Sequence, residues 1–295
     1  MNPLIRTVSD TALWVAMYRA MESERSDALF HDPYARTLAG ERGAEIVRTM
    51  PSGRSMAWPM IVRTAVMDEI ILRLVGSGVR TVLNLAAGLD TRAYRLRLPV
   101  SLRWFDVDLP EIIAYREQHL ADATPACLHE HVTADLADEG ERTSVLARTA
   151  REHGPALVIT EGLLIYLTAP QVAAMASQIG EVPAVQWWLT DLGSPRLLRM
   201  LRRRWHSNLA AANAPMQFAP AEGTAFFAPF GWREAEFRST WEESLRLRRS
   251  APMAGFWNWL GRLQPRSRRE ESLRMSAIVL LGRASADVRS LGKTE

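Results

Sequence analysis

Cysteine and lysine are nearly absent from this chain of 295 residues, which contains one of each, Cys127 and Lys293. A single cysteine can form no internal disulfide, and it also excludes a structural zinc site built on cysteines. Arginine therefore supplies the basic charge, with a formal net charge of +3 and an isoelectric point of about 9.4. Because phosphate-tracking surfaces usually mix lysine with arginine, an arginine-rich codon bias explains this composition more simply than nucleic-acid binding. We expect no nucleic-acid partner.

Long hydrophobic runs are also missing, since no apolar segment approaches the roughly 20 residues of a membrane span. The first residues, Met1 to Leu4, lack the basic, apolar and small-residue order of a secretion signal. We therefore expect a cytoplasmic protein without a membrane partner. Hydrophobic residues nevertheless make up 47% of the chain, enough to fill the core of one large α/β domain or two small ones. Nothing in the sequence indicates an oligomeric state.

Residues 1–78 are predicted to form a helical cap. Asp10 is the expected N-cap of a first helix, whose apolar residues recur at helical spacing. Asp32 and Pro33 are typical of the cap and the first turn of a second helix. A third, long amphipathic helix is predicted over residues 61–74.

Short apolar segments alternate with helical ones after the cap, which is typical of an α/β fold with a doubly wound, mostly parallel sheet. Strands are predicted near residues 80–85, 102–107, 127–133, 155–160, 184–191, 232–238 and 275–282. The alternation stops over 194–230, an arginine-rich helix and a loop long enough to act as a lid. We predict one domain made of a helical cap (1–78), a cofactor-binding core (79–193), a lid insertion (194–230), C-terminal strands with a helix (231–283) and a loose tail (284–295).

The sequence also lacks the glycine-rich motif of dinucleotide-binding proteins. The segment from Val82 to Leu96 is an apolar strand, a small-residue turn (Ala86-Ala87-Gly88) and a polar segment with helical character. This layout is typical of a strand that brings a nucleotide-type ligand to the start of a helix. The turn lacks the Gly-x-Gly-x-x-Gly pattern that cradles a pyrophosphate. A cofactor with a ribose and no phosphates fits better, and S-adenosylmethionine is such a cofactor.

Acidic residues follow four successive predicted strands: Asp90, the pair Asp106 and Asp108, Asp135, and Glu161. The carboxyl ends of parallel strands share one edge of the sheet, where open α/β sheets bind ligands. Asp108 lies about 20 residues after Gly88, the spacing of a carboxylate that accepts hydrogen bonds from ribose hydroxyls. We assign Asp135 to the adenine amino group, with the Leu136 backbone beside the ring. Glu161 is assigned to the methionine part or the reacting centre.

These segments resemble the leucine carboxyl methyltransferase family. The similar stretches are Asn84 to Arg92, Val107 to Pro110, Ala134 to Leu136, Thr160 to Leu167, Arg19 to Ala35 and Gly231-Trp232, within a resemblance that runs from about residue 10 to 283. Bacterial members of the family include carboxyl O-methyltransferases of aromatic polyketide biosynthesis, of the tetracenomycin type. The resemblance implies a Rossmann-like class I methyltransferase fold and S-adenosylmethionine as the cofactor.

The resemblance also implies residue roles. Arg63 corresponds to the family's cofactor arginine, which would grip the methionine carboxylate bidentately. The roles implied for the acids agree with those given above, and the turn residues Ala86 and Gly88 would contact the cofactor. The family's first turn glycine falls at Ala86, a departure from the pattern. Its methyl group must point away from the cofactor, or the backbone must shift.

Two residues are candidates for the chemical step. Tyr166 follows the fourth strand and could line the acceptor site. His206, beside Trp205 in the lid, is the histidine best placed as a general base, although a lone histidine is more often structural. His129 and His131 alternate on a strand with no carboxylate or cysteine at metal-binding spacing, so we predict no metal site.

The ten tryptophans indicate a flat aromatic acceptor, because several lie near the lid and the carboxyl-terminal segments. These are Trp187, Trp188, Trp205, Trp257 and Trp259, for which core packing is the alternative. A carboxylate acceptor has a pKa of roughly 4 and needs no base. It needs a cation to position it, and Arg92, Arg196 or Arg199 could supply one. The sequence predicts an O-methyltransferase that acts on a carboxylate, or a phenol, of a small natural-product acid.

Other activities stay open. Methyltransferases that act on exocyclic amines commonly carry Asn/Asp-Pro-Pro-Tyr/Phe after the fourth strand, where this chain has Thr160 to Leu163. A magnesium-dependent catechol methyltransferase would need Asp and Asn ligands after the fifth strand. This chain has Asp191 there and no Asn beside it. N- or C-methylation of another small molecule or a peptide remains an alternative. A non-catalytic cofactor-binding protein is the other alternative.

Overall fold

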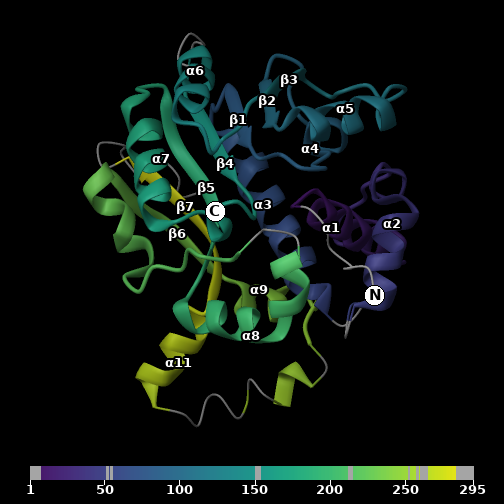
Figure 1. The fold of residues 1–295 in the computed structure, drawn as a ribbon, viewed down its shortest axis with the longest axis vertical. Helices are drawn as coiled ribbons and strands as arrows, with labels where there is room; N and C mark the ends of the chain where they lie inside the picture. The colour runs from purple at the N-terminus through teal and green to yellow at the C-terminus, as the bar shows by residue number, and fades with distance from the viewer. Residues whose placement is uncertain are drawn as a thin grey trace.

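A seven-stranded sheet forms the centre of the molecule, with the strand order β3-β2-β1-β4-β5-β7-β6 (Figure 1). The computed structural model describes residues 8–50, 53, 56–149, 154–211, 215–251, 253–256, 259 and 265–283. Its strands are β1 (Thr81–Leu85), β2 (Arg103–Asp108), β3 (Leu128–Thr133), β4 (Ala156–Thr160), β5 (Val185–Gly193), β6 (Trp232–Ser239) and β7 (Ser276–Arg283). The first five pair in parallel, and β7 pairs antiparallel with both β5 and β6. The predicted strands and the mostly parallel sheet are confirmed.

Helices cover both faces of this sheet and extend beyond its edge (Figure 1). They are α1 (Val8–Ser23), α2 (Ala35–Thr49), α3 (Trp58–Gly76), α4 (Arg92–Arg95), α5 (Pro110–His119), α6 (Glu139–Thr149), α7 (Ala169–Glu181), α8 (Pro195–Ala211), α9 (Thr240–Arg246) and α11 (Arg266–Leu273), with 3-10 helices η2 (Leu164–Tyr166) and η3 (Gly223–Phe230). The first three lie within residues 1–78, for which the sequence predicts a helical cap, and α3 packs against the sheet. In Figure 1 α1 and α2 lie together on one side, while α8, α9 and α11 lie together below the sheet. No helix among the described residues is long and apolar enough to cross a membrane.

Both predicted helix caps in the amino-terminal region are wrong. The first helix already begins at Val8, so Asp10 lies inside it. The second helix has Tyr34 at its N-cap position with no side-chain cap. Asp32 Oδ1 accepts a hydrogen bond from Tyr34 N at 3.2 Å, ahead of the helix, while the buried Oδ2 accepts hydrogen bonds from Arg19 Nε at 2.8 Å and Thr91 Oγ1 at 2.7 Å. The carboxylate therefore ties α1 to the segment that follows β1.

The two faces of the sheet carry separate apolar cores. Successive residues of a strand point to opposite faces, and β1 shows this alternation. Leu83 packs in the same core as Met175 of α7, whereas Val82 packs in the core that contains Ile70 of α3. Side chains from both faces hold the strands in place, so the carboxyl edge is a rigid base for the site.

Trp187 and Trp188 belong to these cores and not to a binding surface. Trp188 is fully buried and contacts the rings of Phe227 and Trp232 edge-to-face, at centroid distances of 5.2 and 5.7 Å. Trp187 packs on the opposite face. The suggestion that these two indole rings indicate an aromatic acceptor is wrong, because two adjacent residues of a central strand each fill one core.

The predicted lid consists of two different parts. Its second part, η3, places Phe227 fully in the core and therefore belongs to the body of the domain. Its first part, α8, presents Leu197, Met200 and Leu201 to the main cavity, whereas Arg196, Arg199, Arg202 and Arg203 are exposed and do not line it. Met216 and Phe218, which lie between these two parts, also line the cavity, and the role of the insertion as a lid stays a prediction.

Candidate active site

A cavity of about 610 Å³ lies at the carboxyl ends of β1, β2, β4 and β5. Helices α1, α3, α8, α9 and α11 supply its other walls. The predicted site residues that line it are Arg63, Ala86, Gly88, Asp108, Glu161 and Tyr166. The expectation that side chains at successive strand ends meet at one edge is therefore confirmed for three of the four strands.

The turn after β1 has a backbone suited to glycine. Ala86 has φ of 54° and Gly88 has φ of 52°, both in the left-handed region. An L-residue with a Cβ pays a steric cost there, which glycine avoids. Ala86 thus adopts the conformation that a glycine would take, and the backbone has not shifted to avoid it.

Asp108 fastens this turn to the end of β2. Its Oδ2 accepts a hydrogen bond from Gly88 N at 2.6 Å, and its Oδ1 accepts one from Leu109 N at 2.8 Å. Burial raises the pKa of this carboxyl above its ordinary value, and the two backbone hydrogen bonds oppose the shift. Each carboxylate oxygen keeps a further lone pair, so Asp108 can still accept hydrogen bonds from a ligand in the cavity.

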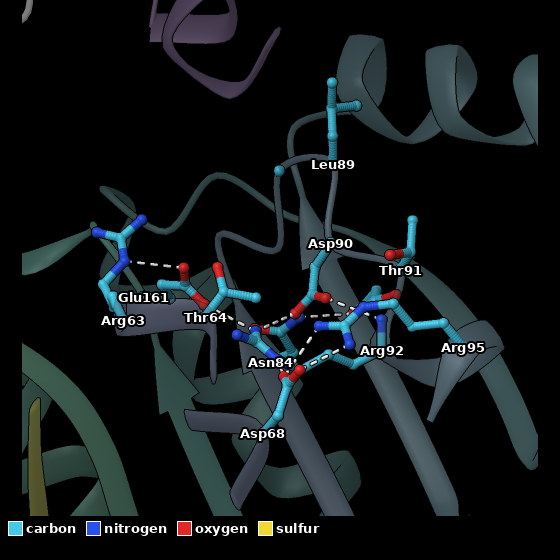
Figure 2. A network of polar contacts seen from close by, with 12 residues as sticks. Arg63, Thr64, Asp68, Asn84, Leu89, Asp90, Thr91, Arg92, Arg95 and Glu161 are labelled. Atoms are coloured by element: carbon cyan, nitrogen blue, oxygen red, sulfur yellow. Dashed lines mark hydrogen bonds and ion pairs between the residues drawn. The ribbon is translucent and has the colours of Figure 1, made fainter. Parts of the chain in front are cut away.

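Glu161 lies at the centre of an ion network (Figure 2). Its Oε1 accepts a hydrogen bond from Arg63 Nε at 2.9 Å, and its Oε2 accepts one from Arg92 Nη1 at 2.7 Å. Burial alone would raise the pKa of Glu161, but the guanidinium groups of Arg92 and Arg63 outweigh it and lower the pKa to about 2. Glu161 is therefore a fixed anion and a poor proton acceptor.

Arg92 is itself surrounded by carboxylates. Figure 2 shows it between Asp68 and Asp90, which it contacts at 2.6 and 2.7 Å in addition to Glu161. The side chain is 2% exposed. Burial tends to lower the pKa of Arg92, but these carboxylates raise it well above its ordinary value. With three anionic partners, Arg92 has no charge left to position an acceptor, contrary to one of our suggestions.

Arg63 connects this network to β5. Its Nη1 donates to Asp191 Oδ2 at 3.1 Å, and Asp191 Oδ1 accepts a hydrogen bond from Gly162 N at 2.6 Å. Nε and one terminal nitrogen of Arg63 are thus engaged by carboxylates. A bidentate grip on a ligand carboxylate would require Arg63 to leave Glu161 or Asp191, and this role stays a prediction.

Asp106 is structural, unlike its neighbour Asp108. It is 1% exposed, is paired with Arg116, and accepts hydrogen bonds at 2.8 Å from Trp104 Nε1 and His129 Nε2. These partners, with the Arg116 guanidinium first, hold the pKa of Asp106 well below its ordinary range against the effect of burial. Arg116 also donates a hydrogen bond to the Gly88 carbonyl at 2.8 Å, so this cluster holds the turn after β1 in place.

The sequence suggested that no carboxylate accompanies His129 and His131, and this is wrong. Asp106 on the neighbouring strand brings a carboxylate oxygen within 4.8 Å of a ring nitrogen of each. Strand pairing creates this proximity, which spacing along the chain cannot show. The guanidinium of Arg116 is already paired with the Asp106 carboxylate and would repel a metal cation. We therefore assign no metal to the cluster.

Asp135 and Leu136 are not among the residues that line the cavity. The Asp135 side chain is exposed and accepts a hydrogen bond from Ala137 N at 2.8 Å. The Leu136 carbonyl accepts one from Arg142 Nη1 at 2.7 Å. Their assignment to adenine stays a prediction that the outline of the cavity does not support.

Of the two candidates for the chemical step, Tyr166 lines the cavity, and burial raises the pKa of its hydroxyl. The side chain of His206 lies outside the described residues, as does that of Trp205, although α8 includes both positions. Arg196 and Arg199 of the same helix are exposed and are not among the cavity-lining residues. Neither of these two arginines lies where it could position an acceptor.

The aromatic walls of the cavity come from residues that sequence reasoning did not select. Trp58 of α3 and Trp241 of α9 contact each other edge-to-face at 6.2 Å, and Phe218 lines the same cavity. Trp259 is 57% exposed and is not among the lining residues, and Trp257 lies outside the described residues. No local pattern distinguishes Trp58 or Trp241, because 183 positions separate them along the chain.

Comparisons with known proteins identify the family of this chain. Residues 12–180 match the model of the leucine carboxyl methyltransferase family. A protein of Frankia alni, named as a predicted S-adenosyl-L-methionine-dependent methyltransferase, is 30% identical over 240 residues, which cover 77% of this chain and 83% of that protein. A Parafrankia protein with the same kind of name is 36% identical over 187 residues, or 60% of each chain.

Solved structures share the fold at low sequence identity. A Thermobifida fusca protein, named as a predicted methyltransferase, superposes with a TM-score of 0.59 at 14% identity, over 96% of both chains. A Streptomyces avermitilis protein gives 0.55 at 14% identity, over 91% of this chain and 96% of that one. The chain belongs to the leucine carboxyl methyltransferase family and is an S-adenosyl-L-methionine-dependent methyltransferase.

Proposed function

We propose that this enzyme methylates a carboxylate of a small natural-product acid, such as an aromatic polyketide acid, and acts in the cytoplasm. The observation that carries this proposal is the lack of a suitable base. No histidine is among the described residues that line the cavity, and the central acid Glu161 has a pKa of about 2. A carboxylate acceptor, with a pKa of roughly 4, is already an anion at neutral pH and needs no base. A phenol acceptor would need one.

The cavity fits the cofactor at the turn after β1. A Cβ built at Gly88 would make one ordinary contact, with the methyl group of Ala12 at 3.5 Å. The backbone of residues 86–88 would lie against the nucleoside, and Asp108 would accept hydrogen bonds from the ribose hydroxyls. Arg63 and Glu161 would hold the methionine end. When bound, S-adenosylmethionine supplies an electrophilic methyl group on a sulfonium.

Rate acceleration would then rest on alignment and on exclusion of water. Displacement at the methyl carbon requires the carboxylate oxygen in line with the departing sulfur, and holding reactants in that geometry removes much of the barrier. The apolar side of α8 and the rings of Tyr166 and Phe218 line the cavity and would keep water from the reacting atoms. Tyr166 would contact the acceptor without moving a proton.

The product distinguishes this function from its alternatives. Enzyme, methyl-labelled S-adenosylmethionine and a set of aromatic carboxylic acids are incubated, and the products are treated with mild alkali. A methyl ester releases labelled methanol, which is the expected result. Label that survives alkali would mean a phenyl ether, a methylamine or a C-methyl product, and would reject carboxyl methylation.

A further inference from the structure

The end of the cavity that lies far from β1 combines aromatic side chains with one arginine. It is lined by Trp58, Pro59, Thr240, Trp241, Arg269, Ser272, Leu273, Met275 and Ser276. Ser276 pairs with Gly193, so the turn between α11 and β7 stands beside the carboxyl end of β5. The strand order places β7 three spacings from β1, roughly 14 Å at about 4.8 Å per strand. This end therefore lies beyond the region over β1 and β2 assigned to the nucleoside.

Arg269 is the cation of this remote end. The other arginines that line the cavity are neutralised within the protein, Arg19 by Asp32, and Arg63 and Arg92 by the network around Glu161. Arg269 is exposed and has no ion-pair partner among the residues that the structure describes. The carboxylate of Asp191 also lines the cavity but is already held by Arg63 and by Gly162 N.

We infer that Arg269 binds an anionic group of the acceptor, separate from the carboxylate that receives the methyl group. This inference rests on the proposed function and names its substrate class: an aromatic acid with a second anionic group at its far end. The methylated carboxylate lies over the end of β4, where the cofactor would present its methyl group. The aromatic body lies between the Trp58 and Trp241 rings and the apolar side chains of Leu273 and Met275. The planar guanidinium of Arg269 then pairs with the second anion.

Binding of matched acids tests this inference. The probes are benzene, naphthalene and anthracene monocarboxylates and the corresponding dicarboxylates with carboxyl groups at opposite ends. Each is titrated calorimetrically into the full chain with S-adenosylhomocysteine present. The variants are Arg269→Gln and, as the matched control, Arg268→Gln, because Arg268 is an exposed neighbour on α11 that does not line the cavity.

At one of the three lengths the dicarboxylate should bind the wild-type enzyme about ten-fold more tightly than its monocarboxylate, as a charge-assisted pair allows. Arg268→Gln should keep this preference, and Arg269→Gln should lose it while monocarboxylate binding is unchanged. Equal binding of mono- and dicarboxylates at every length, a preference that survives in Arg269→Gln, or no binding of any acid would overturn the inference. A preference that depends on Arg269, together with alkali-stable methyl products, would retain this subsite and reject carboxyl methylation.

Discussion

At the scale of single residues, Ala86 is the position where this chain departs from its family. Its φ of 54° costs an L-residue roughly 1–2 kcal/mol. Ala86→Gly removes that cost. Glycine also increases the conformational entropy of the unfolded chain, which reduces the gain in stability by roughly 0.4–1 kcal/mol. We therefore expect the free energy of unfolding to rise by about 0.5–1 kcal/mol, measured by urea denaturation.

The neighbouring alanine provides the control for this substitution. Ala87 is buried and is not among the residues with positive φ, so Ala87→Gly should lower the free energy of unfolding by roughly 0.5–1 kcal/mol. If Ala86→Gly destabilises the protein as much as Ala87→Gly does, the left-handed turn described for Ala86 is wrong.

At the scale of elements, Glu161 joins α3 to β4 and to the segment after β1 through Arg63 and Arg92. Its folded pKa of about 2 lies below its ordinary value of 4.5. A depressed carboxyl pKa stabilises the fold above the unfolded value, and the contribution is lost as the pH falls. The free energy of unfolding should thus decrease from about pH 4.5 towards pH 2.

Glu161→Gln isolates this contribution. The variant should be less stable at pH 7 by about 3 kcal/mol, since it leaves buried guanidinium charge without one partner. Its loss of stability between pH 4.5 and 2 should be shallower than that of the wild type. Glu242→Gln, at an exposed glutamate, serves as the control. Identical pH profiles for wild type and Glu161→Gln would show that this carboxylate titrates normally.

The elements of the sheet were predictable, whereas some side-chain partners were not. Strands such as β1 and β4 are short apolar runs bounded by turn residues, so their positions follow from local sequence. Asp32 carries the local signature of a helix cap, yet Arg19 and Thr91 bind its carboxylate. Tertiary ion pairing determined its position, and a local pattern cannot reveal it.

Some residues of the candidate site could likewise be predicted from the sequence, and others could not. Residues at strand ends, such as Asp108 and Glu161, could be predicted because parallel strands bring their carboxyl ends to one edge. Trp241 and Arg269 come from helices whose packing over that edge depends on the whole fold. The proximity of Asp106 to His129 likewise depends on which strands are neighbours.

At the scale of the whole molecule, a buried ion pair links α1 to the carboxyl-terminal half. Glu22 of α1 is fully buried, and both of its oxygens lie 3.0 Å from Nε of Arg249, which follows α9. Removing one partner of a buried pair leaves an uncompensated charge. Arg249→Met should therefore lower the free energy of unfolding by about 3–5 kcal/mol in urea titrations.

A double variant separates the charge effect from lost packing. Glu22→Gln combined with Arg249→Met removes both charges and should recover a large part of the stability. Arg25→Met, at a 49% exposed side chain that lies 3.8 Å from the same Glu22 carboxylate, should cost less than about 1 kcal/mol. If Arg249→Met is no more destabilising than Arg25→Met, the two halves are not joined through this pair.

Titration of S-adenosylmethionine into the wild type, Asp108→Ala and Asp122→Ala, followed by calorimetry, tests the central claim most directly. The cavity at the strand ends should bind the cofactor, and loss of the Asp108 carboxylate should weaken binding about ten-fold or more. Asp122 is exposed and does not line the cavity, so Asp122→Ala should bind as the wild type does. Absence of binding at millimolar cofactor, or an Asp108→Ala affinity equal to that of the wild type, would contradict the account.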